Sequence, residues 1–292
     1  MTEVLIAIGI LGGLGLVFGL VLAAASKVFY VETDPRLEKL NECLPGANCG
    51  GCGYAGCGGY AEAVLNGEAT IGKCASGGNE CAQAMGEIMG IKADTVTRKV
   101  ALVRCSGEKI YDKDGNLTHG ARLKANYEGF KDCMAASKVG GSGPLSCKYG
   151  CLGFGTCVKA CKYGAIKVAN GVAHVDEDLC VGCMACAAAC PRNLIVPVEP
   201  GHNVVIACNS MAKGAVTTRG CTVGCIGCGL CKKICPNDAI TVTKNLAVID
   251  YSKCDNCGLC ATVCPKKLIK NSNVENLSDP VIHSRNNPDA IV

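Results

Sequence analysis

Three cysteine runs constrain the fold of this chain more than any other feature of its sequence. Each run has the spacing C-x2-C-x2-C-x3-C and is followed by proline, which is the spacing of iron–sulfur ligands in bacterial ferredoxins. The runs lie at 180–191, 225–236 and 254–265. A fourth run, at 147–161, has the altered spacing C-x3-C-x5-C-x3-C, and Lys162 follows it in place of proline.

The runs repeat at a fixed offset of 74 residues. Cys180 aligns with Cys254 at this offset, and each copy contains a short β-like segment that ends in an acidic residue. This pattern predicts two tandem ferredoxin-like modules, each of βαββαβ-like order and each with room for two clusters. We place the modules at 146–204 and 205–270.

Ligand sets follow from a rule of two-cluster ferredoxins, in which the fourth cysteine of each run ligates the cluster of the other run. The rule predicts three sets: Cys180, Cys183, Cys186 with Cys161; Cys225, Cys228, Cys231 with Cys264; and Cys254, Cys257, Cys260 with Cys235.

The altered run lacks one ligand, because Phe154 stands where the offset would place its middle cysteine. We expect Cys147, which is close in sequence and joined by a glycine-containing loop, to supply the missing sulfur. The predicted set is then Cys147, Cys151, Cys157 and Cys190 around a [4Fe–4S] cluster. The alternative is a site of three cysteines that holds a [3Fe–4S] cluster.

A further set lies in a glycine-rich segment upstream of the modules. Its members, spaced C-x2-C-x4-C-x16-C, are Cys49, Cys52, Cys57 and Cys74. This spacing predicts a fifth [4Fe–4S] cluster in a small domain at 30–90, with a structural zinc site as the alternative. The segment also contains a G-x-G-x-x-G match, but cysteines occupy its interior and no strand precedes it, so we expect no nucleotide site there.

Composition supports metal as the stabilising element of the fold. The chain has 292 residues and 26 cysteines, but no Trp and only four Phe, so its apolar core must be thin. C-x2-C pairs favour metal over disulfides, because they bring several thiolates onto one ion or cluster. We therefore expect an α+β fold stapled by iron–sulfur clusters. The net charge of +4 is too small to indicate nucleic-acid binding.

Five clusters use twenty cysteines and leave six, namely Cys43, Cys81, Cys105, Cys133, Cys208 and Cys221. Six are enough for one more cluster with two to spare, but they form no short-spaced set. We expect structural or spare thiols, and a sixth cluster stays an open alternative.

The N-terminal segment has the properties of a membrane anchor. Val4 to Ser26 is a run of 23 residues without a charge, and a helix of this length, at roughly 35 Å, would cross a bilayer core of ~30 Å. A cleaved signal peptide is disfavoured, because Glu3 and no basic residue precedes the run. Lys27 follows it, which places the bulk of the chain in the cytoplasm under the positive-inside rule. We therefore expect a single-pass anchor at 1–29 in the cell (cytoplasmic) membrane.

Two regions carry less information. Residues 91–145 form a connecting region with one strand-like stretch, and 271–292 form a polar tail. Between 205 and 270 there are nine Lys or Arg and three Asp or Glu. These cations either offset the charge of bound clusters or form a docking face for an acidic protein carrier.

Several clusters on one chain without a recognisable substrate pocket indicate an electron carrier. The anchor, the "CGGCGYAGC" segment, "CKYGCLGFGTCVKAC" and the ferredoxin runs together resemble the B subunit of the Rnf/Rsx ion-translocating ferredoxin:NAD+ oxidoreductase complex. The resemblance covers nearly all of the chain. One departure is the second complete ferredoxin module.

The resemblance implies a subunit of a hetero-oligomeric membrane enzyme. Such a subunit would accept electrons from reduced ferredoxin in the cytoplasm and relay them through [4Fe–4S] clusters to membrane-embedded and flavin-bearing subunits. NAD+ reduction and Na+ or H+ translocation would take place on those partners, so no substrate-transforming site is expected on this chain. The alternatives are a membrane-tethered redox sensor or scaffold, and an anchored polyferredoxin without ion coupling.

Overall fold

The structure is a computed structural model that describes residues 2–28, 34–93 and 95–271. Side chains at the ends of the first helix are described only in part. Residues 1 and 29 of the predicted anchor, and the predicted polar tail beyond residue 271, lie outside the described residues.

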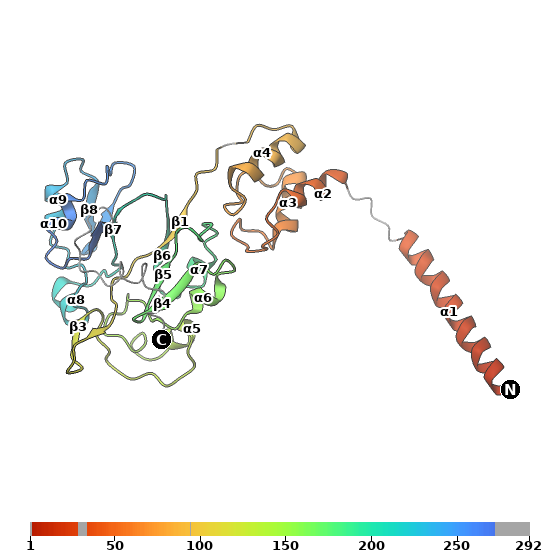
Figure 1. The fold of residues 1–292 in the computed structure, drawn as a ribbon, viewed down its shortest axis with the longest axis horizontal. Coiled ribbons are helices and arrows are strands. Elements are labelled where there is room, and N and C mark those ends of the chain that lie inside the picture. The colour runs from red at the N-terminus through yellow and green to blue at the C-terminus, as the bar shows by residue number, and fades with distance from the viewer. Residues whose placement is uncertain (1, 29–33, 94, 272–292) are drawn as a thin grey trace.

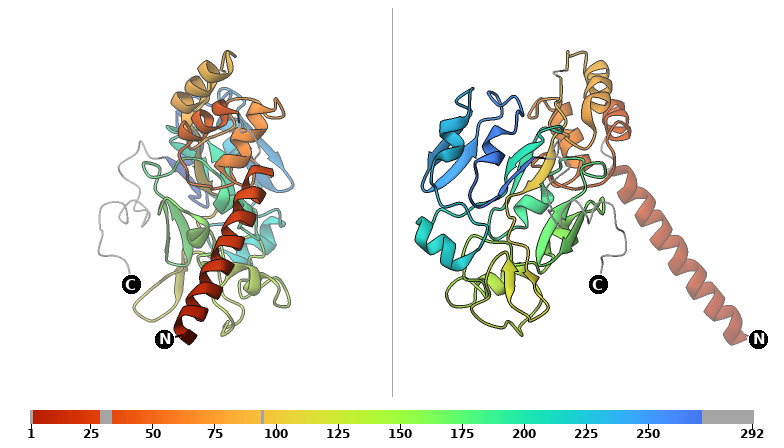
Figure 2. Two further views of the ribbon diagram at one scale, coloured as in Figure 1. Left: turned by 90° about the vertical axis from the view of Figure 1, so that its right-hand side faces the viewer. Right: turned by 60° about the vertical axis from the view of Figure 1, so that its left-hand side comes forward.

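The N-terminal helix α1 (Thr2–Val28) projects away from the other elements (Figure 1). The right-hand view of Figure 2 shows the same separation. Its sequence is rich in Leu and Ala, which favour a helix, and large apolar side chains described along it are exposed, such as Leu11 at 70% and Leu22 at 68%. Among the residues that the structure describes, we find no helix with both the length and the apolar character that crossing a membrane requires.

A small helical unit follows the N-terminal helix. It consists of α2 (Pro35–Glu42), α3 (Cys57–Leu65) and α4 (Gly78–Met89). Helix α2 starts where the Asp34 carboxylate accepts the backbone N–H of Arg36 at 2.9 Å, which satisfies one of the free donors of the first turn. Leu40, Tyr60 and Met85, one from each helix, are at most 1% exposed and form the core of the unit.

Five two-stranded antiparallel sheets make up the described β structure. They pair β1 (Val100–Val103) with β6 (Ile195–Val198), β2 (Ile110–Tyr111) with β3 (Leu117–His119), β4 (Ile166–Ala169) with β5 (Val172–Val175), β7 (Val204–Ile206) with β10 (Ile269–Asn271), and β8 (Ile240–Thr243) with β9 (Leu246–Ile249). Short helices connect them, namely α5 (Cys133–Ser137), α6 (Thr156–Ala160), α7 (Ala185–Ala188), α8 (Gly214–Gly220), α9 (Leu230–Ile234) and α10 (Leu259–Thr262).

The 74-residue repeat of the sequence is also a repeat of elements. At this offset α6 corresponds to α9, the hairpin β4–β5 to β8–β9, and α7 to α10. In each copy the two helices contact one another, α6 with α7 and α9 with α10. Each copy ends in a strand, β6 or β10, that pairs antiparallel with a strand from before the cysteine runs.

The strand that pairs with β6 lies outside the bounds predicted for the first module. Strand β1 falls in the region 91–145, and its Val100 stands opposite Val198. In the second module the equivalent strand is β7, whose Ile206 stands opposite Ile269. The segment from 104 to 150 therefore interrupts the first module between its first strand and Cys151, and we call this segment the insertion.

The insertion packs against the start of the second module. Ala121 forms an isolated β-bridge with Cys221, and the backbone N–H of Thr222 donates to the carbonyl of Gly120 at 3.0 Å. Leu145 and Val223 lie in one small buried cluster beneath these contacts. The insertion therefore joins the two modules to each other.

Candidate metal centres

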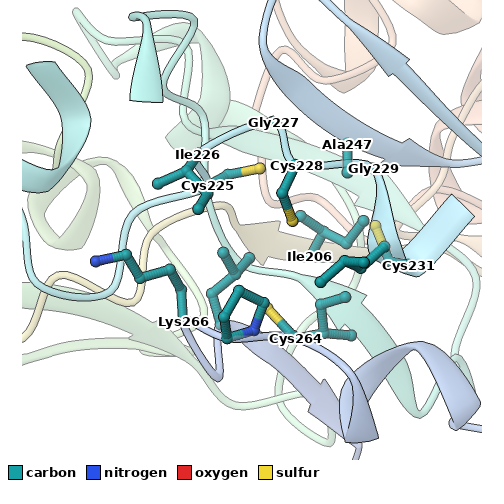
Figure 3. Close-up of a pocket in the computed structure, with 14 residues that line it drawn as sticks. Ile206, Cys225, Ile226, Gly227, Cys228, Gly229, Cys231, Ala247, Cys264 and Lys266 are labelled. Carbon is teal, nitrogen blue, oxygen red and sulfur yellow. The ribbon is translucent and has the colours of Figure 1, made fainter. Parts of the chain in front are cut away.

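The second module contains a cavity lined by four cysteine side chains. Cys225, Cys228 and Cys231 come from one run and Cys264 from the other. This is the set that the ligand rule of two-cluster ferredoxins predicts. Figure 3 shows their sulfur atoms facing the same space. The remaining walls are largely apolar and include Ile206. Four sulfur donors around an apolar space fit the ligand requirement of an iron–sulfur cluster.

The loop of this cavity needs two glycines. Gly227 and Gly229 have φ values of +68° and +76°, a backbone region that favours glycine. A Cβ on Gly227 would also lie 2.9 Å from backbone atoms of Asn245. With a larger residue at position 227, the loop could not approach the β8–β9 turn this closely. The glycines therefore let the backbone wrap around Cys228, the middle cysteine of the run.

Electrostatics in this cavity favour a cationic occupant. Burial raises the pKa of the Cys231 thiol, and the neighbouring thiols of Cys225, Cys228 and Cys264 raise it further. Four thiolates this close repel each other unless positive charge lies between them. Coordinating iron supplies that charge and removes the thiol protons.

The first module has the equivalent cavity, but one of its cysteines differs from the prediction. Cys151, Cys157 and Cys190 line it as expected, and the fourth cysteine is Cys133 rather than Cys147. The thiols of Cys133 and Cys157 both lie within electrostatic reach of Cys151.

Cys133 is held in place by the loop of the cysteine run. Its backbone N–H donates to the Thr156 hydroxyl at 2.8 Å, and that hydroxyl donates to the carboxylate of Asp132 at 2.8 Å. Cys133 thus stands at the first turn of α5 and is 8% exposed. The repeat gave no signal for it, because residue 207, at the same offset in the second copy, is alanine.

The loop around Phe154 has the same backbone conformation as its counterpart in the second module. Gly153 and Gly155 have φ values of +78° and +74°, close to those of Gly227 and Gly229. Phe154 therefore occupies the backbone position of Cys228, and its ring packs on Tyr127 at a centroid distance of 5.2 Å.

The structure also brings together the other predicted set of the first module, which consists of Cys180, Cys183, Cys186 and Cys161. Burial raises the pKa of Cys186 to about 11, and the thiols of Cys183, Cys180 and Cys161 lie close enough to raise it further. Cys180 Sγ accepts the backbone N–H of Ala101, on β1, at 3.3 Å. Hydrogen bonds from backbone to sulfur are one means by which a protein sets the potential of a cluster.

The remaining predicted set of the second module lies in the same buried core as the Cys225 set. Burial raises the pKa of Cys260 to about 11, with further contributions from Cys231, Cys254 and Cys257. Cys235 packs against this core and is partly buried. The structure therefore brings Cys254, Cys257 and Cys260 together and leaves Cys235 at the edge of the same core.

The set upstream of the modules sits on the small helical unit. The Asn48 side chain accepts the N–H of Cys57 at 2.8 Å, and Cys49 Sγ lies 3.8 Å from the Ser76 hydroxyl. Cys81, which the sequence left unassigned, is a buried neighbour of this set. Its hydrogen bond to Cys74 lowers the pKa of Cys74.

The helical unit contacts the first module directly. Lys162, which stands in place of the usual proline, donates to the carbonyls of Ala47 at 2.9 Å and Asn48 at 2.8 Å. A Cβ on Gly51 would overlap the carbonyl oxygen of Cys183. The sets that contain Cys49 and Cys183 are therefore adjacent.

No group of three or more His, Cys, Asp and Glu side chains in the described ranges is arranged to hold a metal ion. A four-iron cluster distributes its four thiolates over four iron atoms, so its ligands stand farther apart than those of one ion.

Four family models match parts of the chain. The model described as a putative Fe-S cluster matches residues 44–76, and a 4Fe-4S dicluster domain matches 224–268. Two further models, both described as 4Fe-4S binding domains, match 173–196 and 151–165. The chain thus contains several iron–sulfur domains of the ferredoxin type.

Whole-chain relatives carry consistent names. The B subunit of the Na(+)-translocating ferredoxin:NAD(+) oxidoreductase complex of Acetobacterium woodii is 42% identical over 87% of this chain and 74% of its own length. The B subunit of the ion-translocating oxidoreductase complex of Methanosarcina acetivorans is 41% identical over 87% of this chain and 93% of its own. The chain belongs to this family of B subunits. A proton-translocating relative from Clostridium ljungdahlii is 42% identical over 87% of both chains.

The family models do not cover every cysteine of this family member. Five cysteines in or between the modules lie outside the matched ranges, namely Cys105, Cys133, Cys147, Cys208 and Cys221. Cys133 lines the cavity of the first module described above. The other four lie where the two modules meet.

Proposed function

We propose that this chain is the electron-transfer subunit of an ion-translocating ferredoxin:NAD+ oxidoreductase complex. It accepts electrons from reduced ferredoxin and delivers them to partner subunits of the complex. The observation that carries the proposal is that cysteine sets adjoin one another, the first three in one series and the last two in another, because electron transfer over a distance requires such neighbouring sites.

The proposed ligands form five sets, each for one [4Fe–4S] cluster. They are Cys49, Cys52, Cys57, Cys74 (first set); Cys133, Cys151, Cys157, Cys190 (second); Cys161, Cys180, Cys183, Cys186 (third); Cys225, Cys228, Cys231, Cys264 (fourth); and Cys235, Cys254, Cys257, Cys260 (fifth). A bound cluster supplies one-electron chemistry, because it gains or loses one electron without forming or breaking a bond to substrate. The second set replaces Cys147 of the sequence prediction with Cys133.

Direct contacts support the adjacency of the first three sets. Gly51 and the carbonyl of Cys183 meet between the first and third sets. The thiol of Cys157 in the second set is within electrostatic reach of Cys186 in the third. The order along this part of the chain is therefore first, third, second.

In the second module, Cys231 of the fourth set is within electrostatic reach of Cys260 of the fifth. Among these five sets, the described contacts join the first three and the last two, and the two modules meet between the second set and the fourth.

We also propose that α1 anchors the chain in the membrane, with the modules on the cytoplasmic side. The support is the uncharged run from Val4 to Ser26, the exposure of side chains such as Leu16 at 64%, and Lys27 in the last turn. The names of the relatives refer to Na+ in one case and to protons in another. NAD+ reduction and ion translocation belong to partner subunits in this proposal.

The proposal is tested by mixing reduced ferredoxin with the anaerobically purified full chain and following cluster absorbance by stopped flow. We expect the absorbance loss to correspond to several clusters, because the adjoining sets share electrons. Oxidised ferredoxin is the control. Reduction of a single cluster, with the rest left oxidised, would contradict the relay and favour a redox sensor.

A further inference from the structure

Cys105 and Cys208 occupy equivalent places in the two modules. Each stands two residues after the first strand of its module, Cys105 after β1 and Cys208 after β7. They are 103 residues apart, because the insertion lengthens the first copy, so the 74-residue offset does not align them.

The two thiols have the same backbone partners. Cys105 Sγ accepts the N–H groups of Gly107 and Cys151, each at 3.4 Å. Cys208 Sγ accepts the N–H groups of Ser210 at 3.5 Å and Cys225 at 3.3 Å. In both cases one donor is the residue two positions later, and the other is Cys151 or Cys225, which align at the 74-residue offset. Two backbone N–H donors stabilise the thiolate form of each sulfur.

Cys147 and Cys221 form the second equivalent pair. Cys147 lies four residues before Cys151, and Cys221 lies four residues before Cys225. The backbone of Arg122 brings them together, because its N–H donates to the carbonyl of Gly220 at 2.9 Å and its carbonyl accepts the N–H of Ser146 at 2.8 Å.

The two segments approach each other closely at position 220. A Cβ on Gly220 would lie 3.3 Å from the carbonyl group of Ser146 and 3.4 Å from the backbone nitrogen of Cys147. The residues that precede the two cysteines therefore pack backbone against backbone.

The four thiols meet at one place. The Cys221 thiol is 6% exposed, and the thiols of Cys105, Cys147 and Cys208 all lie within its electrostatic reach. Burial, together with these three neighbours, raises the pKa of Cys221 to about 12. Cys208 is likewise within reach of Cys147.

We propose that Cys105, Cys147, Cys208 and Cys221 bind a sixth [4Fe–4S] cluster between the two modules. Two of the ligands come from the first module with its insertion, and two from the second. The inference goes beyond the five sets of the proposed function and rests on the iron–sulfur chemistry proposed there.

The position of this sixth site fills the gap in the series of cysteine sets. Cys105 Sγ accepts the N–H of Cys151, which belongs to the second set. Cys208 Sγ accepts the N–H of Cys225, which belongs to the fourth set. The order of sites through the chain is then first, third, second, sixth, fourth, fifth, without a break.

The test compares the full-length wild type with the double variant Cys208→Ser/Cys221→Ser after anaerobic purification. We expect the variant to contain about four fewer irons and four fewer acid-labile sulfides per chain, since one [4Fe–4S] cluster is lost. The matched control is Cys43→Ser, which removes a partly buried cysteine of the helical unit outside all six sets and is expected to leave the iron content unchanged.

A milder variant keeps the test decisive if the double variant does not fold. Cys221→Ser alone leaves three ligands, so we expect about one iron fewer per chain and a [3Fe–4S] EPR signal in the oxidised protein. Iron content equal to wild type in these variants overturns the sixth site, as does one zinc per chain that the double variant loses. A wild type with hardly any iron would instead overturn the proposed function.

Discussion

At the scale of single residues, Cys133 and Cys147 differ in what holds them. Cys133 is tied to the cysteine run through Thr156, whose hydroxyl accepts its N–H. Cys147 follows Ser146, which is hydrogen-bonded to Arg122 and packed against Gly220. Closeness in sequence favoured Cys147 for the second set, but backbone hydrogen bonds direct its segment toward the second module.

The second set predicts a specific result for Cys133→Ser. Three cysteines remain, so we expect about one iron fewer per chain and a [3Fe–4S] EPR signal in the oxidised protein. Adding Phe154→Cys should remove this signal and restore the iron, because Phe154 occupies the loop position that Cys228 has in the second module. A Cys133→Ser variant with wild-type iron and no three-iron signal would show that Cys133 is not a ligand.

At the scale of elements, α1 is set apart from the rest of the fold. The helical unit and the two modules each have a buried core of their own, and no described side chain of α1 belongs to any of these cores. The iron–sulfur part of the chain should therefore fold without this helix.

Deletion of residues 2–28 tests the role of α1. We expect the shortened protein to move from the membrane fraction to the soluble fraction and to keep its iron content, because no cysteine lies in the deleted segment. Iron per chain and the membrane-bound fraction are measured in the absence of partner subunits. Full retention in the membrane fraction would contradict the anchor, and loss of iron would show that α1 supports the fold.

At the scale of the whole molecule, the features that recur in both copies of the 74-residue repeat could be predicted from the sequence. The offset of 74 residues aligned the hairpins β4–β5 and β8–β9 and the crossed cysteine runs, because ligand spacing is local and tolerates little variation. The cysteine set around Cys49 and its small domain at 30–90 were likewise predicted from local spacing.

Contacts between distant segments could not be predicted in this way. Strand β1 pairs with β6 across about 95 residues of chain, and the insertion between them carries Cys105, Cys133 and Cys147. Because the insertion has no counterpart of equal length in the second module, Cys105 and Cys208 fall at a different offset from the runs. Only the three-dimensional arrangement brings them together.

The central claim is that nearly all cysteines of this chain are ligands of iron–sulfur clusters. The most direct test is the iron and acid-labile sulfide content of the anaerobically purified full-length chain. We predict about 24 irons and about 24 sulfides per chain, from six [4Fe–4S] clusters. A chain that holds zinc in place of iron, with little acid-labile sulfide, would contradict the account.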